Sequence, residues 1–427
     1  MVAWPSREEL NCWLTLQLAI SGSGVLPLPH CFAAVGVPLG VACCVAVALL
    51  NDATTQWLLA AAAPLRLGER VARSYSDLAA RANFSARTKL AVEASSAILL
   101  FGSLAACLAA VGENAARAVH TASGWRAAAE ARVVAPAAAG LGAAAAGLRA
   151  FDDMAWTSGL GLLFLAALLL AVVGACAATL GDGGVPPLAP ESWAELPSAV
   201  STLGYSLYVG PIALSMVDDR PGRLGVVARA THACFFTTTL IYVVLGVAGA
   251  SWLGRATPSD VSTAFSPGVR GGAWAANVVP GGTVLYLALA TAPMLNPLRD
   301  SVAALAGREV TDGAVTAAVL ALVVLSVVLA STLESLLIFS LSGATGVCVT
   351  CYVVPVACLW SIPRDRDPKD YVGYRRSKEA FLRDVLGPGL ALFFGVSFSA
   401  LTVVLAVLQT AESVVIAGEA SLGPEEG

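Results

Sequence analysis

Long apolar stretches separated by short polar or Pro/Gly-rich breaks run along the whole chain. An apolar window of about 20 residues is long enough to cross a hydrocarbon core of ~30 Å as a helix. Eleven windows meet this description, and we predict membrane-spanning helices over residues 11–35, 38–63, 88–112, 132–149, 156–179, 197–216, 229–253, 279–297, 313–332, 335–360 and 386–410. The pattern therefore predicts an all-α polytopic membrane protein.

Composition supports this fold class. Of the 427 residues, 57% are hydrophobic and 13% are charged, which is too apolar for a soluble protein of this length. Alanine and glycine are abundant in the apolar windows and favour close helix packing in lipid. No basic cluster with interleaved aromatic residues indicates nucleic acid, and no phosphate-binding loop indicates an ATP motor. We expect a lipid-embedded monomer without a metal or a resident cofactor.

The basic residues predict the orientation, because Lys and Arg are retained on the cytoplasmic side during insertion. With the N-terminus inside, 20 of the 25 basic residues fall in cytoplasmic segments. The C-terminus is then outside or in a lumen, and the membrane can be the plasma membrane or a vacuolar or lysosomal one. One transmembrane domain, 1–427, is predicted. It comprises a cytoplasmic segment 1–10, helices 1–5 in 11–179, helices 6–10 in 197–360, an eleventh helix at 386–410 and an outer tail at 411–427.

Two of the predicted helices contain breaks. The first helix holds Ser21-Gly22-Ser23-Gly24-Val25 followed by two prolines, and an uninterrupted helix rarely accepts this density of Gly and Pro. Non-helical backbone inside a bilayer survives only where protein buries it or where it lines a watery cavity. The amides of residues 22–24 could therefore face a carboxylate ligand. The alternative is a proline kink with glycines that serve packing.

The sixth helix has a similar break over Gly204 to Pro211. Paired breaks in the leading helices of two five-helix halves indicate a binding site at the middle of the membrane between inverted repeats. Carbonyl groups freed in the second break could receive an ammonium group. The two breaks together thus predict a site for a zwitterion.

Four stretches resemble the amino acid/auxin permease family, which includes sodium-coupled neutral amino acid transporters and vacuolar amino acid transporters. They are GSGVLPLPHCF (22–32), LRAFDDMAWTSGL (148–160), TAPMLNPLR (291–299) and LESLLIFSLSGATGVCVTCYVVP (333–355). The resemblance implies a fold like that of the leucine transporter, a 5+5 inverted repeat plus an eleventh helix. It also implies secondary active transport of amino acids by alternating access, coupled to H⁺ or Na⁺.

The resemblance also implies site residues. Substrate contacts would fall on the two breaks, at Ser21, Gly22, Ser23, Gly24, Val25, Tyr205 and Ser206. For a sodium site, Thr291 matches the family threonine of helix 8, but Thr15 stands where relatives carry an asparagine. This departure puts sodium coupling in doubt.

Three ionisable groups within predicted helices are further candidates. Asp52 lies in the middle of helix 2, where a carboxylate is costly unless it is paired or hydrated. We expect either a proton-coupling role for Asp52 or a structural hydrogen-bond cluster with its polar neighbours. Glu93 is a second coupling candidate that could instead extend to the interface, and His30 could confer pH dependence or simply pack. His120 and His232 have no acidic neighbour at ligand spacing in the sequence, so a metal site is not supported.

Three functional classes compete. The leading one is a secondary transporter of neutral amino acids. The alternative is an amino acid sensor that binds the same ligand without net transport. An intramembrane enzyme would need a motif such as paired carboxylates, and the adjacent Asp152 and Asp153 fit a solvated loop better. We therefore expect no enzymatic activity.

Overall fold

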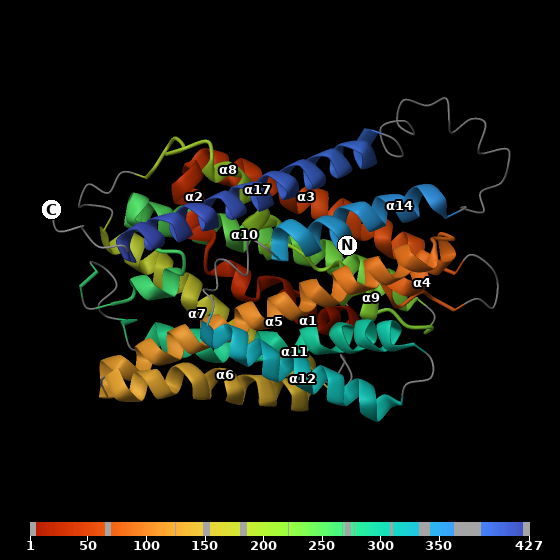
Figure 1. Ribbon diagram of the computed structural model, residues 1–427, viewed down its shortest axis with the longest axis horizontal. Helices are drawn as coiled ribbons and strands as arrows, with labels where there is room; N and C mark the ends of the chain where they lie inside the picture. Colours follow the sequence, from red (N-terminus) through yellow and green to blue (C-terminus); the bar gives the residue numbers. More distant parts are fainter. Residues whose placement is uncertain are drawn as a thin grey trace.

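The computed structural model describes residues 6–64, 70–123, 125–147, 154–179, 186–220, 222–266, 268–269, 275–276, 278–307, 311–332, 342–362 and 386–421. Within these ranges the secondary structure is helical, and the long helices lie side by side along the longest axis of the molecule (Figure 1). Among the described residues, eight helices are long and apolar enough to cross a membrane, and the bent pair at the N-terminus, counted as one span, gives a ninth.

The first half of the chain contains the helices α1 (Arg7–Ser21), η1 (Ser23–Val25), α2 (Leu28–Val35), α3 (Val37–Ala62), α4 (Tyr75–Arg81), α5 (Ala86–Ser123), α6 (Trp125–Gly147) and α7 (Ala155–Thr179). The second half contains α8 (Glu195–Ser206), α9 (Gly210–Ser215), α10 (Arg223–Leu253), η3 (Gly254–Ala256), η4 (Val261–Ala264), α11 (Val278–Ala306), α12 (Asp312–Thr332), the π-helix η6 (Gly343–Val353), α14 (Val354–Ser361) and α17 (Gly387–Ser421).

The eleven predicted spans fall on these helices or on their broken pairs, except that positions 148–149 and 335–341 lie outside the described residues. The boundaries differ in several places. Helix α1 starts at Arg7, inside the segment predicted as a cytoplasmic end, because Ser6 caps it by accepting a hydrogen bond from the Glu9 amide at 3.2 Å. Helices α5 and α6 extend through the region predicted to connect them, where alanine favours helix. Helix α17 continues to Ser421, past the predicted limit at 410.

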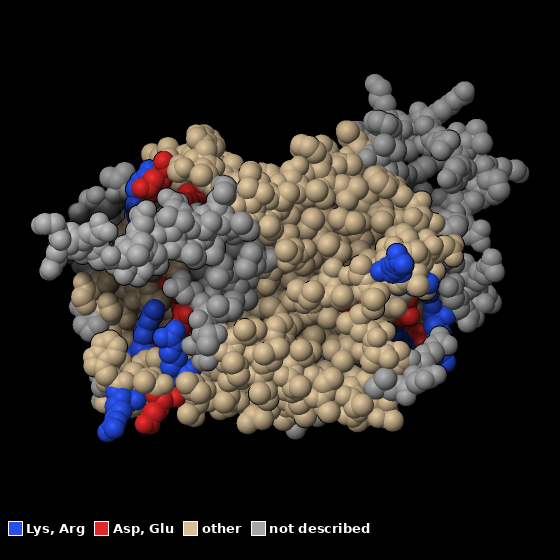
Figure 2. All heavy atoms as spheres, viewed as in Figure 1, with Lys and Arg blue, Asp and Glu red and all other residues tan. Residues whose placement is uncertain are grey.

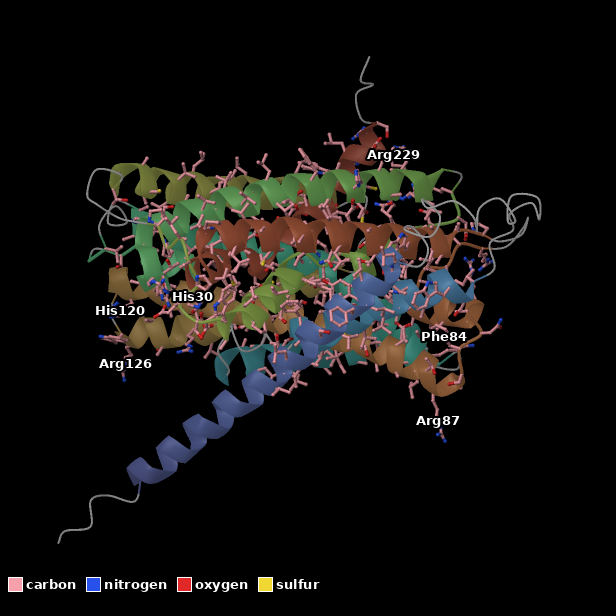
Figure 3. All side chains as sticks on the ribbon, turned by 90° about the horizontal axis from the view of Figure 1, so that it is seen from above. His30, Phe84, Arg87, His120, Arg126 and Arg229 are labelled. Atoms are coloured by element: carbon pink, nitrogen blue, oxygen red, sulfur yellow. The ribbon has the colours of Figure 1, made fainter. Side chains whose placement is uncertain are left out.

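Charged side chains gather at the two ends of the bundle, and uncharged ones occupy the belt between them (Figure 2). We call the end that carries Arg73, Arg81, Arg87, Arg220 and Arg223 the basic end. In Figure 3, Phe84 and Arg87 lie at this end, whereas His30, His120 and Arg126 lie at the opposite end. This arrangement is the one that an integral multi-pass membrane protein requires.

Ion pairs at the basic end tie the start of α1 to the start of α10. Arg223 has a side chain that is only 2% exposed, and its Nη1 lies 2.7 Å from Oε1 of Glu8. Arg229 pairs with Glu9 at 3.1 Å. Because α1 begins the first half of the chain and α10 lies in the second, these pairs join the two halves.

The short helix α4 covers the basic end of α3. Ser74 caps α4 by accepting a hydrogen bond from the Asp77 amide at 3.1 Å. The guanidinium group of Arg81 donates to the carbonyls of Ala62 and Ala63, both at 2.8 Å, and so satisfies carbonyl groups at the end of α3. This helix was not predicted from the sequence.

Candidate functional site

The first break separates α1 from α2. Gly22 ends α1 with a φ of +20°, a conformation that side-chain-bearing residues rarely adopt, and its ψ of −148° turns the chain out of the helix. The single turn η1 follows, and α2 begins at Leu28 between two prolines. The two parts of the span are bent by 55°. The predicted interruption is therefore present at the predicted residues.

The second break separates α8 from α9 and lies against the first. Helix α8 ends at Ser206, and α9 begins at Gly210. The hydroxyl of Ser206 donates to the carbonyl of Gly24 at 2.8 Å. A Cβ atom on Gly24 would lie 2.7 Å from Cα of Ser206, so only glycine allows this approach. The two breaks are thus in direct contact through the turn η1 and the end of α8.

Two buried tyrosines satisfy carbonyl groups that the breaks release. Tyr242 on α10 points its hydroxyl at the carbonyls of Ile20 and Ser206, at 2.9 and 2.8 Å. Tyr286 on α11 donates to the carbonyl of Gly22 at 2.7 Å. A buried carbonyl without a partner is costly, so these hydroxyls make the breaks tolerable inside the bundle.

Asn51 on α3 performs the same task for the second break. Its Nδ2 donates to the carbonyl of Leu207 at 3.2 Å and approaches that of Gly204 at 3.5 Å. In this conformation the protein itself supplies a donor to these carbonyls, so a substrate ammonium would have to displace Asn51, and its binding here stays a prediction. The amide of Gly22 is also paired, with the carbonyl of Leu18 at 3.1 Å, and does not point at a ligand.

Polar but uncharged side chains meet where the breaks face α5. The thiol of Cys107 donates to the hydroxyl of Ser23 at 3.3 Å. Tyr205 interacts with the hydroxyls of Ser23 and Ser103, and its ring centre lies 5.7 Å from that of Tyr208. We call these five residues the polar cluster. All five are buried, and none carries a charge, so the cluster suits an uncharged polar group.

The segment that follows α10 reaches the first break from the opposite end. The amide of Val261 donates to the carbonyl of Leu26 at 3.2 Å. Nδ1 of His30 lies 2.9 Å from the carbonyl of Thr257, so this nitrogen carries the hydrogen. His30 therefore has a packing and hydrogen-bonding role here.

A buried carboxylate and its hydrogen-bond partners anchor the same segment to α5. The carboxylate of Asp260 is 4% exposed and accepts hydrogen bonds from the amide of Ser262 at 2.8 Å and from Asn114 at 3.0 Å. Ser262 also donates to Oδ1 of Asn114 at 2.6 Å. These bonds fix the segment over the break.

Helix α4 approaches the second break from the basic end. The hydroxyl of Tyr75 donates to the carbonyl of Thr350 at 3.1 Å and lies 3.0 Å from where a Cβ on Gly210 would be. Glu93 on α5 holds α4 by accepting a hydrogen bond from the Ser76 amide at 2.7 Å. Glu93 is 2% exposed, so the expectation that it extends to the interface is wrong.

The structure brings Asp52 together with a residue that sequence reasoning had set aside. Oδ2 of Asp52 on α3 lies 2.6 Å from Nδ1 of His232 on α10. Its Oδ1 accepts a hydrogen bond from Gln56 at 3.3 Å. Sequence spacing does not reveal this pair, because the two residues are 180 positions apart and meet only in the fold.

The two threonines considered for a sodium site each use their hydroxyl within their own helix. Thr15 donates to the carbonyl of Asn11 at 3.1 Å, and Thr291 donates to that of Ala288 at 2.7 Å, each within its own helix. Both are fully buried. A sodium role for this pair stays a prediction from the resemblance.

A separate hollow of about 400 Å³ lies between α6, α7 and α11. Small apolar residues line most of it, and its hydroxyl-bearing residue, Thr157, already donates to the carbonyl of Met154 at 2.8 Å. Such a lining has no free hydrogen-bonding side chain for a carboxylate or an ammonium group among its described residues. The breaks and the polar cluster remain the candidate site.

Comparison with known proteins agrees with this geometry. The sequence profile described as transmembrane amino acid transporter protein matches residues 9–362. The chain belongs to the transmembrane amino acid transporter family. Its structure is similar to that of Mhp1, a nucleobase-cation-symport-1 family transporter, in a closed conformation with bromovinylhydantoin bound. The TM-score is 0.56 at 13% identity, with 92% of each chain covered. Comparison with curated proteins gave no match.

The comparisons confirm the predicted family and the fold like that of the leucine transporter. The family assignment makes the chain a transporter rather than an enzyme. The residues that hold the breaks, Asn51, Tyr75, Tyr242 and Tyr286, were not singled out from the sequence. The available signal was a large polar side chain within an apolar run, such as Tyr242 after three threonines. That signal does not reveal which carbonyl group the side chain binds.

Proposed function

We propose that this family member transports neutral amino acids by secondary active transport, with the substrate held at the two breaks. The contact between Gly24 and Ser206 carries the proposal, because it brings the breaks of two interrupted helices together inside the bundle. Backbone dipoles there suit the carboxylate and ammonium groups of a zwitterion once the hydrogen bonds to the tyrosines rearrange. The absence of charge in the polar cluster supports an uncharged side chain.

In alternating access, the site would be closed from one end of the bundle while it opens at the other end. The segment around Val261 covers the first break from the opposite end, and Tyr75 supports the second break from the basic end. Release of one covering at a time would open the site to one side only. The distribution of basic residues supports a cytoplasmic basic end.

Coupling would use H⁺ or Na⁺. Asp52 is the candidate for protons, since it pairs with a titratable histidine across two helices. Thr291 and Thr15 are the sodium candidates that the family resemblance supplies, and Glu93 is a further buried carboxylate.

The test is uptake of radiolabelled neutral amino acids into proteoliposomes, with a proton gradient or a sodium gradient imposed separately. Flux above that of protein-free vesicles, stimulated by one gradient, is the expected result. Saturable binding without flux under either gradient would contradict transport and favour the sensor. Neither binding nor flux of any amino acid would overturn both functions.

A further inference from the structure

One hydroxyl in the polar cluster has no partner. Tyr208 lies between α8 and α9, is 3% exposed, and its hydroxyl has no hydrogen-bond partner in the described structure. Ser103 on α5 is a hydroxyl neighbour that interacts with Tyr208, but the hydroxyl hydrogen of Ser103 goes to the carbonyl of Leu99 at 2.8 Å and is not available to Tyr208. A buried, unpaired hydroxyl is unfavourable, so its retention needs an explanation.

The surroundings of this hydroxyl indicate what would pair with it. Tyr205 lies beside Tyr208, and Cys107 lies within electrostatic reach. Their side chains carry hydroxyl, thiol and aromatic groups, and these groups do not stabilise a full charge. Backbone dipoles at a helix break do stabilise one. A phenol hydroxyl both donates and accepts, so a neutral group that does the same satisfies it completely.

We propose that Tyr208 makes the transporter selective for amino acids with a hydroxyl or carboxamide side chain over aliphatic amino acids of the same shape. The inference rests on the proposed function. The hydroxyl of Tyr208 would hydrogen-bond to the substrate side chain, while the backbone of the breaks holds the ammonium and carboxylate groups. An aliphatic side chain would enter the same space and leave the hydroxyl unpaired. A site built to hydrogen-bond its substrate rejects analogues without that group far better than a hydrophobic pocket rejects an added hydroxyl.

The experiment compares two nearly isosteric pairs, threonine with valine and serine with 2-aminobutyrate, by kcat/KM of uptake in proteoliposomes. The wild-type protein is expected to prefer the hydroxyl member by about tenfold or more. Tyr208→Phe removes only the hydroxyl and is expected to bring both ratios close to one. Ser158→Ala is the matched control, because Ser158 on α7 also has a buried, unpartnered hydroxyl but lies outside the polar cluster. Its ratios should equal those of the wild type.

Several results would overturn the inference while leaving the proposed function intact: equal uptake of the two members by the wild type, a preference for valine, or an unchanged ratio in Tyr208→Phe. Uptake of other amino acids, but of no member of the two pairs, would also overturn the inference and leave the proposed function intact. If Tyr208→Phe does not fold, thermal unfolding of the wild type decides. Threonine should raise the Tm and valine should not at equal concentration, and equal shifts would reject the role of Tyr208. Transport of no amino acid at all would instead reject the proposed function.

Discussion

Nδ1 of His232 on α10 lies 2.6 Å from Oδ2 of Asp52 on α3. A carboxylate within a bilayer is costly unless it is paired, and the histidine supplies the partner. Asp52 is 13% exposed and His232 is 72% exposed, so the histidine covers the carboxylate toward the outside of the bundle. The pair joins two helices that both contact the breaks, because Asn51 precedes Asp52 and Tyr242 follows His232 on α10.

The first prediction concerns this pair. Asp52→Asn keeps the shape of the side chain but cannot bind and release a proton. If Asp52 couples transport to protons, the variant loses stimulation by a pH gradient and retains exchange of labelled for unlabelled substrate. Asp312→Asn, at an exposed helix start, should behave as the wild type. Gradient stimulation that persists in Asp52→Asn would remove Asp52 from the coupling mechanism.

The second prediction concerns the contact between the breaks. Gly24→Ala places a methyl group 2.7 Å from Cα of Ser206, and this overpacking should destabilise the protein by about 1–3 kcal/mol and abolish uptake. Gly174→Ala is the control, because no atom lies within 4 Å of its added methyl group. Thermal unfolding in detergent and uptake measure the two effects. Normal uptake by Gly24→Ala would show that the breaks need not touch.

The third prediction concerns the tyrosine that bridges the breaks. Tyr242→Phe leaves the carbonyls of Ile20 and Ser206 without this donor, and we expect a loss of about 1–3 kcal/mol in the free energy of unfolding. Thr239→Val on the same helix removes a hydroxyl that donates only to the carbonyl of Phe235, one turn back, and should change stability little. Equal stability of the two variants would contradict the bridging role of Tyr242.

The fourth prediction concerns orientation. Asn83-Phe84-Ser85 is a glycosylation sequon, and it lies at the basic end, which we assign to the cytoplasm (Figure 3). Asn83→Gln should therefore cause no change in mass by gel mobility after expression in a glycosylating host. Cysteine substitutions at Arg87 and Arg126 should be labelled by an impermeant reagent from opposite sides. Labelling of both from one side would contradict the assignment.

Much of the fold follows from local sequence properties. Apolar windows locate the spans, and the Gly and Pro residues of 21–29 and 204–211 locate both breaks, because backbone preferences act within a few residues. Pairings between distant helices cannot be obtained in this way. The hydrogen bond from Tyr286 to Gly22 joins residues 264 positions apart, and the pair of Asp52 with His232 has no local signal at all.

The central claim is that the two breaks together hold an amino acid, and an experimental structure determined with saturating L-threonine tests it most directly. We predict density for the ligand between residues 22–25 and residues 205–208, with the threonine hydroxyl facing Tyr208. Ligand density in another part of the bundle, with the breaks packed as they are without ligand, would contradict the account.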